Sequence, residues 1–419
     1  SGTSVTWDNS GNPATGSNSV TAEEIVKTNY WSAVVSGRNS CSISLYTTSN
    51  DFEISALPTG FTAIDTTNIA SNISRSDSNT NKYFEATIYT GSGSEKSVQS
   101  STTTNTSAFS WIKNRGTDDN HMLFDRVRGV TKDWHSNSDA IQATNVQTVK
   151  AFLGGGVTIG TDVEVNTSSE NYVLWNWMMS ASGGGSSNED GSINTTATLV
   201  DTTLGLSISQ YTGTGSNATI GHGLGAVPKF IIIKNLDVAE DPVAYHEALG
   251  NTERILLNSS NSPSSSTVFW QNTTPTSSVI SIGTDSGLNQ SSQTFICYAF
   301  TDSQFVSIGS YAGNNNANGT FVPTLNSLGL PIQPVWAILR SSAGSNWSIF
   351  DNKRLGYNPE NAHLDANATT VGSTADNLDI VTGGLKMRIA TDPNVAETYI
   401  YMAIGTPMID TDGRIIAGR

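Results

Sequence analysis

The chain has 419 residues, only 14% of them charged, with a formal net charge of −15 and an isoelectric point near 4.6. That acidic balance argues against nucleic acid, since a phosphate backbone calls for a basic surface, and no apolar run reaches the roughly 18 residues of a membrane-spanning helix. Ser, Thr, Asn and 38 glycines replace the missing charges, and 36% hydrophobic residues suffice for packed cores.

The first 66 residues read as several strands, among them Tyr30–Val35 and Cys41–Tyr46. A sandwich of this size on its own would have a thin core, so we expect residues 1–66 to be the C-terminal part of a larger β-sandwich. Residues 67–81 are polar and are predicted to be a linker. The chain begins at Ser1 rather than Met, so we expect a processed product or a fragment of a longer one.

Three segments then repeat one order of signals: Tyr83–Ser180, Leu204–Asp302 and Phe305–Pro407. Each opens with a strand that ends in a Tyr-x-Gly turn, at Tyr89–Gly91, Tyr211–Gly213 and Tyr311–Gly313. An apolar strand closed by a basic residue follows, at Phe109–Asn114, Phe230–Asn235 and Trp336–Arg340. Such ordered landmarks in three copies indicate an internal repeat.

Two further landmarks complete each repeat. One is an aromatic residue followed by a polar one, at Asp125, His246 and Asp351. The other is an aromatic-rich closing strand, at Tyr172–Trp177, Phe295–Phe300 and Tyr399–Ile404. The first two repeats also share a turn, Ile159–Asp162 and Ile282–Asp285, which the third lacks.

The repeats have the size of small domains and consist of short β-branched and aromatic runs split by Gly, Asn and Ser. We therefore predict an all-β chain of tandem antiparallel β-sandwich modules, because a sheet with one apolar face must cover it with another. The modules are repeat 1 (residues 82–181), repeat 2 (204–302) and repeat 3 (303–419, with a C-terminal tail). Residues 182–203 are predicted to be a Gly/Ser-rich linker.

Several motifs that suggest chemistry are better explained by structure. His222 lies in Gly221–Gly225, but a strand rather than a helix follows, so we predict a tight loop instead of a phosphate site. Gly154–Gly156 is interpreted in the same way. Asp410–Gly413 resembles the start of a calcium loop but lacks the Glu that completes one, so we predict a turn. Cys41 and Cys297 are predicted to be buried thiols.

We predict no catalytic residue, metal site or cofactor. Asp125, His246 and Asp351 occupy one repeated position, and an active site copied three times would not be expected to change its key residue from Asp to His. We expect hydrogen bonds at strand ends, with Arg126–Gly129 and Lys353–Arg354 pairing with the acids on the surface. No Ser/His/Asp set can be chosen among five histidines, and sequence cannot supply the carboxylate separation that glycan hydrolysis requires.

A ligand-binding role is predicted for aromatic and polar residues in loops, where a platform for stacking sugars would lie. The candidates are Trp134, His135, Trp347, Tyr357 and Asn358. The alternative is that each anchors its loop.

The chain resembles a known family along nearly its whole length. Ser32–Ile64, with its Leu57–Phe61 turn, resembles the last strands of a SPRY-type β-sandwich in phage virion proteins. The stretches that follow resemble the repeat-bearing region of marine tailed-phage structural proteins: Ile112–Arg115, Leu123–Val130, Gly221–Lys229, Val243–Thr252, Phe350–Arg354 and Tyr357–Pro359. The resemblance implies that residues 1–66 are part of a SPRY-like domain and that the chain is a virion component.

We therefore expect a non-enzymatic phage virion structural protein, a tail fibre or surface appendage located on the phage particle. Its expected partners are other virion proteins and a host-surface glycan or receptor, without nucleic acid or membrane insertion. We expect a homo-oligomer, with a trimer favoured by analogy to phage fibres. Two alternatives remain: a decoration protein of the capsid or tail that binds only virion proteins, and a polysaccharide depolymerase.

Overall fold

The structure is a computed structural model that describes residues 5–12, 17–21, 82–99, 104–354, 358 and 360–408. The chain divides into two compact units, Ser1–Asp77 and Ser78–Arg419. In the first unit, β1 (Val5–Asn12) and β2 (Ser17–Thr21) pair antiparallel. The predicted linker at 67–81, most of the SPRY-like segment, Cys41 and the turn at Asp410–Gly413 lie outside the described residues.

The all-β prediction is confirmed: antiparallel sheets make up the second unit, and its described helices are single turns. We call its described part, residues 82–408, the repeat body. Its helices are α2 (Val163–Asn166), α3 (Thr267–Trp270) and α4 (Ser286–Asn289).

Repeat 1 has a large six-stranded sheet in the order β3-β11-β5-β6-β7-β8 and a small sheet β4-β10-β9. The strands are β3 (Phe84–Thr90), β4 (Lys96–Gln99), β5 (Thr106–Asn114), β6 (Met122–Asp125), β7 (Lys132–His135), β8 (Ala143–Thr144), β9 (Val149–Leu153), β10 (Gly156–Ile159) and β11 (Asn171–Met179). The Gly154–Gly156 turn joins β9 to β10, as a tight turn before a strand should.

Repeat 2 follows the same plan, with a large sheet β12-β13-β20-β15-β16-β17-β18 and a small sheet β14-β19. The strands are β12 (Ala197–Asp201), β13 (Leu206–Thr212), β14 (Ala218–Gly221), β15 (Phe230–Asn235), β16 (Val243–His246), β17 (Glu253–Leu256), β18 (Ser264–Ser265), β19 (Val279–Ile282) and β20 (Thr294–Phe300).

In repeat 3 the corresponding strands run on into one eight-stranded sheet, β21-β28-β23-β24-β25-β26-β27-β22. They are β21 (Val306–Ala312), β22 (Phe321–Pro323), β23 (Ile332–Ser341), β24 (Ser348–Asp351), β25 (Glu360–Asp365), β26 (Ser373–Val381), β27 (Gly384–Met387) and β28 (Thr398–Pro407). The pair β22–β27 occupies the place of the small sheets, so the third repeat keeps the plan in spite of its diverged sequence.

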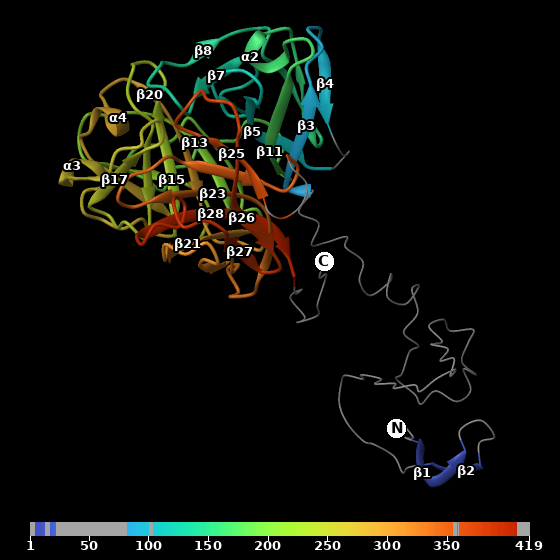
Figure 1. Cartoon of the computed structure of the whole chain (residues 1–419). Coiled ribbons are helices and arrows are strands. Elements are labelled where there is room, and N and C mark those ends of the chain that lie inside the picture. The colour runs from blue at the N-terminus through green and yellow to red at the C-terminus, as the bar shows by residue number, and fades with distance from the viewer. Residues whose placement is uncertain are drawn as a thin grey trace. The chain divides into compact units, whose positions relative to one another are not determined.

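The two faces of each large sheet belong to different cores. Because side chains alternate along a strand, Trp175 of β11 faces one core while Leu174 faces another. β20 and β28 behave alike: Tyr298 and Met402 join Trp175 in one cluster, and the alternate residues fill separate clusters under the outer strands of their own repeat. The three repeats are tandem along the chain, yet they pack around one shared core (Figure 1).

Residues 182–203, predicted to be a linker, are in part a structural element. β12 lies in this segment and extends the large sheet of repeat 2 by pairing with β13. Gly185 packs so closely that an added Cβ would meet the backbone of Thr198 at 2.5 Å. The linker prediction is wrong for this stretch because Ala197–Asp201 forms an edge strand, in which the Thr198 hydroxyl is hydrogen-bonded to that of Thr195 and to that of Ser209 in β13.

Candidate functional site

The repeated polar position after the aromatic residue lies at a seam between repeats. Asp125, His246 and Asp351 end β6, β16 and β24, and all three are buried. The predicted hydrogen-bonding role is confirmed, and the partners come from another repeat. The hydroxyl of Tyr298 donates to Asp125 at 2.6 Å, and the indole N–H of Trp175 donates to Asp351 at 2.8 Å.

The change from Asp to His at the middle position follows from what the facing strand offers. Trp175, Tyr298 and Met402 occupy one register position, opposite Trp111, Ile232 and Ile338. A methionine has no proton to donate, so a carboxylate facing it would lack a partner. His246 instead accepts the N–H of Ala248 on Nδ1 and places Nε2 3.2 Å from the carbonyl oxygen of Tyr401, to which it donates.

These contacts form a closed ring. Repeat 1 reaches repeat 2 through Asp125, repeat 2 reaches repeat 3 through His246, and repeat 3 returns to repeat 1 through Asp351. A head-to-tail contact that closes after three steps is the arrangement of a cyclic trimer, formed here within one chain.

The arginines expected to pair with the acids on the surface are in fact buried. Arg128 contacts Asp125 at 2.5 Å and Arg354 contacts Asp351 at 2.6 Å, with every side chain at most 1% exposed. Each guanidinium also donates to a strand carbonyl, of Leu123 or Ile349. The surface prediction is wrong because the ion pairs are covered where the repeats meet.

The basic residue that closes the second strand of each repeat is also buried. Burial lowers the pKa of Lys113 and of Lys234 to about 8, and that of Arg340 to about 10. Lys234 donates to the carbonyl oxygen of Asp139 in repeat 1 at 2.9 Å, and Arg340 to that of Leu256 in repeat 2, also at 2.9 Å. A lysine with a lowered pKa can act as a nucleophile, but both amines bond to backbone carbonyls inside the protein: Lys113 to those of Asn114 and Thr117 in its own repeat, and Lys234 across a seam.

The two tryptophans predicted to form a sugar platform are not at the surface. Trp134 and Trp347 are each 1% exposed. The indole of Trp134 donates to the Tyr298 hydroxyl at 3.0 Å, and that of Trp347 to the carbonyl of Leu256 at 2.9 Å. The platform prediction is wrong for both, because their rings fill the shared core and their N–H groups bond across seams.

The remaining predicted ligand residues are not brought together. His135 is half-buried, with Nε2 3.4 Å from the Asp133 carboxylate and without a hydrogen bond. Asn358 is exposed, and its side chain bonds to the backbone of Ile380 in repeat 3. Tyr357 lies outside the described residues.

Two other predictions of structural roles are confirmed. His222 lies in a tight loop that includes Gly223 at φ +68°; its Nδ1 accepts the N–H of Leu224, and its Nε2 lies 3.2 Å from the Thr276 carbonyl oxygen. The Cys297 thiol is 1% exposed, and burial raises its pKa.

Sequence reasoning missed an asparagine that holds the outer loops of every repeat. Asn166, Asn289 and Asn394 each accept one backbone N–H and donate to two backbone carbonyls. Beside each asparagine the Tyr of the Tyr-x-Gly turn stacks on the first ring of the closing strand, with centroids 5.0 to 5.1 Å apart. An Asn shortly before each closing strand was the signal that would have found it.

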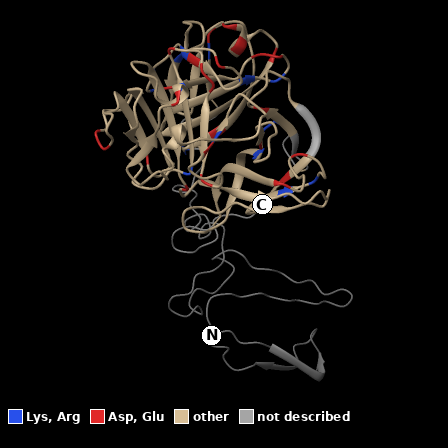
Figure 2. Ribbon diagram, turned by 90° about the vertical axis from the view of Figure 1, so that its left-hand side faces the viewer, with Lys and Arg blue, Asp and Glu red and all other residues tan. Residues whose placement is uncertain are grey.

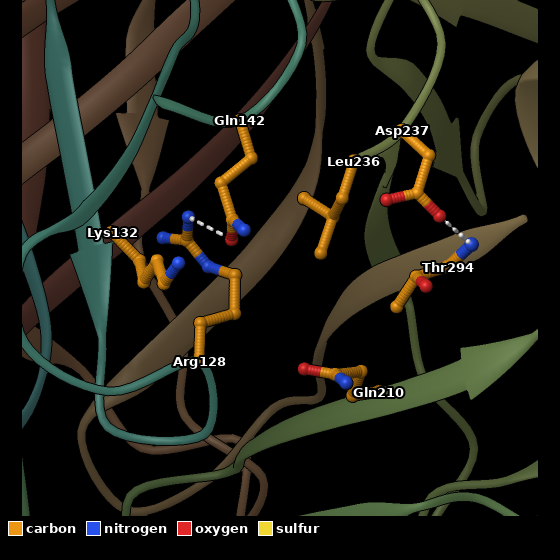
Figure 3. A pocket seen from close by; sticks show the side chains of 7 residues that line it. All are labelled: Arg128, Lys132, Gln142, Gln210, Leu236, Asp237 and Thr294. Carbon is orange, nitrogen blue, oxygen red and sulfur yellow. Dashed lines mark hydrogen bonds between the residues drawn. The ribbon is translucent and has the colours of Figure 1, made fainter. Parts of the chain in front are cut away.

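A polar cavity of about 280 Å³ lies at the seam between repeats 1 and 2 (Figure 3). It is lined by Arg128, Lys132 and Gln142 on one side and by Gln210, Leu236, Asp237 and Thr294 on the other. Arg128 was expected to pair with an acid, but none of these seven residues was predicted to bind a ligand, because the cavity exists only where two repeats meet.

Contacts within the lining hold part of it in place. Gln142 accepts from Arg128 at 3.3 Å and donates its backbone N–H to the Leu236 carbonyl at 3.0 Å. Asp237 accepts the backbone N–H of Thr294 at 2.6 Å. The Gln210 side-chain amide has no hydrogen-bond partner among the described residues, so its donors and acceptor remain free for a ligand.

Charged groups of the repeat body are sparse and scattered rather than gathered in one patch (Figure 2). In the parts of the chain that the structure describes, no group of three or more His, Cys, Asp and Glu is placed to hold a metal ion. None of the helices in these ranges has the length and hydropathy that crossing a bilayer requires.

Residues 79–406 match the model of a family described as a domain of unknown function, DUF7483. The match spans all three repeats as one domain, in agreement with their shared core. A search of curated proteins found no match.

Proposed function

The chain belongs to the DUF7483 family, and we propose that it is a non-enzymatic structural protein of a tailed-phage particle. In this proposal it is a tail fibre or surface appendage that contributes to attachment to a host-surface glycan or receptor. The resemblance of its motifs to marine phage structural proteins supplies the biological setting.

The observation that carries the proposal is the closed ring of repeats around one core. Three sheets that share a core cannot move independently, so the loops on their outer sides keep fixed positions. Loops held by a rigid scaffold are where binding surfaces usually lie. Such a body suits an extracellular particle that must keep its shape without a cofactor.

The test is to locate the chain in the particle. Antibodies raised against residues 82–408 are applied to purified phage and visualised by electron microscopy, and the purified chain is added to host cells before infection. We expect label on the tail and reduced adsorption. Label confined to the capsid or tail wall, with adsorption unchanged, would favour the decoration alternative, and absence of the chain from purified particles would overturn the proposal.

A trimer remains part of the proposal on analogy alone. The repeat body completes its core without a second chain, so copies would associate through its outer surface or through another part of the chain. Mass photometry of the purified chain tests this: a species of three times 44.3 kDa is expected, and a monomer at micromolar concentration would contradict it.

One observation keeps the depolymerase as a second candidate. Burial raises the pKa of Asp392, and the charges of Asp365 and Glu397 nearby raise it further. A carboxyl group whose pKa is raised beside other carboxylates is the pattern of a general acid in glycan hydrolysis. New reducing ends released from host polysaccharide by the wild type, and lost in Asp392→Asn, would favour this candidate; no release across several host polysaccharides would exclude it.

A further inference from the structure

We propose that the cavity between repeats 1 and 2 binds a single neutral pyranose unit of a surface glycan. The inference rests on the proposed attachment function and names the class of ligand and the place where it binds. Its volume of about 280 Å³ lies just below the ~300–1,000 Å³ typical of pockets for drug-sized ligands, so it suits one sugar ring rather than an oligosaccharide.

The lining offers free hydrogen-bonding groups of both kinds. The ammonium group of Lys132 donates one N–H to Thr144 Oγ1, at 2.6 Å, and its other N–H groups remain available to a ligand. Asp237 accepts the Thr294 N–H with one oxygen, and the second carboxylate oxygen remains available. The Gln210 amide supplies a further donor and acceptor. A sugar hydroxyl both donates and accepts, so adjacent hydroxyls can bond to alternating groups of this kind.

The charges of the lining cancel, which favours a neutral ligand. Arg128 is neutralised by the buried Asp125, and the cationic Lys132 is balanced by Asp237 across the cavity (Figure 3). An anionic ligand would be attracted by the charge of Lys132 but repelled by that of Asp237. Leu236 is the one large apolar side chain in the lining, and it gives the C–H face of a sugar ring a contact.

The lysine and the glutamine of the lining are replaced at the seam between repeats 2 and 3. By strand register, the position of Lys132 is Glu253 in repeat 2, because Trp134 and Ile255 pair equivalently with the neighbouring strand. The position of Gln210, next to the stacked Tyr211, is Ser310 in repeat 3, next to Tyr311. The repeats keep the residues that build the fold and differ here, so the fold does not need the lysine or the amide.

The experiment is saturation-transfer difference NMR on the full chain with methyl glucopyranoside, methyl galactopyranoside, methyl mannopyranoside and glucuronate. We expect saturation transfer to at least one neutral methyl glycoside. Gln210→Ala and Lys132→Ala should each weaken that binding about tenfold, because each removes hydrogen bonds to the ligand. Lys150→Ala is the matched control, since Lys150 pairs with Glu95 on an exposed part of repeat 1 and should leave binding unchanged.

Three outcomes would overturn the inference: no neutral glycoside binds, binding survives in the Lys132→Ala/Gln210→Ala double variant, or glucuronate binds more tightly than every neutral sugar. Thermal melts of each variant show whether the fold is intact, and Gln210→Ala provides a second reading if Lys132→Ala is unstable. Failure here with the chain present on the phage tail would reject the cavity alone, whereas sugar binding by a chain absent from particles would reject the proposed virion role.

Discussion

Residues at the seams are selected by what the facing repeat can donate or accept. Asp125 accepts a hydrogen bond from Tyr298, and Asp351 accepts one from Trp175. Each acid also forms an ion pair with an arginine of its own repeat. His246 faces a strand that offers a carbonyl oxygen instead. One position in three repeats therefore carries either an acid or a histidine, and in each case the buried polar group is paired across the seam.

Replacing Asp351 by Asn should destabilise the repeat body strongly. Asn can still accept from Trp175, but it leaves the buried charge of Arg354 without a counter-ion, a loss of about 3–5 kcal/mol for buried pairs. Denaturant unfolding of the full chain measures the change. Glu247→Gln is the control: it breaks a partly exposed pair with Lys229 and should cost less than about 1 kcal/mol. Equal losses in the two variants would contradict the assignment.

Acid should weaken the seam between repeats 2 and 3 through His246. Burial lowers its pKa from 6.5 to about 4, so between these pH values the unfolded chain binds a proton that the folded chain does not. The free energy of unfolding therefore falls as pH drops from 6.5 to 4, by about 3 kcal/mol for this group. Burial also lowers the pKa of His121, His222 and His363, which act in the same direction.

The comparison that isolates His246 is His246→Gln, since Gln donates to the Tyr401 carbonyl oxygen without titrating. Denaturant curves recorded at several pH values should show a shallower loss of stability below pH 6.5 in this variant. Parallel curves for the two proteins would show that His246 does not contribute.

At the scale of elements, each repeat is a large sheet whose outer face is closed by strands and loops fixed to one asparagine. Asn289 connects the loop after β13 to the turn before α4, because its amide bonds to Thr214 N–H and to the carbonyls of Ser216 and Gly283. Asn166 does the same beside α2, and Asn394 does so in repeat 3 without a helix. The asparagine, rather than the helical turn, is therefore what the three elements have in common.

Asn289→Ala should destabilise repeat 2 by about 2–4 kcal/mol, because three backbone groups lose the buried Asn289 side chain as their partner, at roughly 0.5–1.5 kcal/mol each. Denaturant midpoints of the full chain measure the effect. Asn251→Ala serves as the control, since Asn251 also bonds to a backbone carbonyl but near the surface, and its loss should lie below 1 kcal/mol. A small effect of Asn289→Ala would show that its bonds are replaced by water.

At the scale of the whole molecule, the three repeats form one body. Each repeat contributes the inner face of its sheet to the shared core, for example Trp175, Tyr298 and Met402. A repeat taken alone would expose this face to water, which disfavours folding by about 25 cal/mol per Å² of apolar surface. The chain thus places on one polypeptide the contacts that a cyclic trimer makes between subunits.

We expect the repeat body to unfold in one cooperative transition, and a fragment of residues 204–302 to lack a cooperative transition or to aggregate. Differential scanning calorimetry of residues 78–408 and of the fragment measures both. Three separable transitions, or a soluble fragment that melts sharply, would mean that each repeat is stable without the shared core.

Much of the architecture can be predicted from residue order alone. Aromatic and β-branched runs such as Phe230–Asn235 indicate strands, their threefold recurrence indicates equivalent modules, and the loop around His222 is recognisable because a strand follows it. These signals are local or periodic, so they can be recognised in the sequence without the tertiary structure. The candidate site was much less predictable, since the residues that line the cavity come from two repeats and only Arg128 belongs to a motif recognisable in the sequence.

By itself, then, the sequence determined the all-β class, the three repeats and the structural role of Asp125, His246 and Asp351, because each can be recognised from short runs of residues and their recurrence along the chain. Only the tertiary structure decided that the repeats close around one core, that Trp134 and Trp347 are buried there, and that Lys132 and Gln210 meet across a seam. The physical reason is that an aromatic side chain has the same sequence signature whether it covers its own sheet or a neighbour's. Which of the two it covers depends on contacts between residues more than 100 positions apart, such as Trp134 and Tyr298 at a separation of 164.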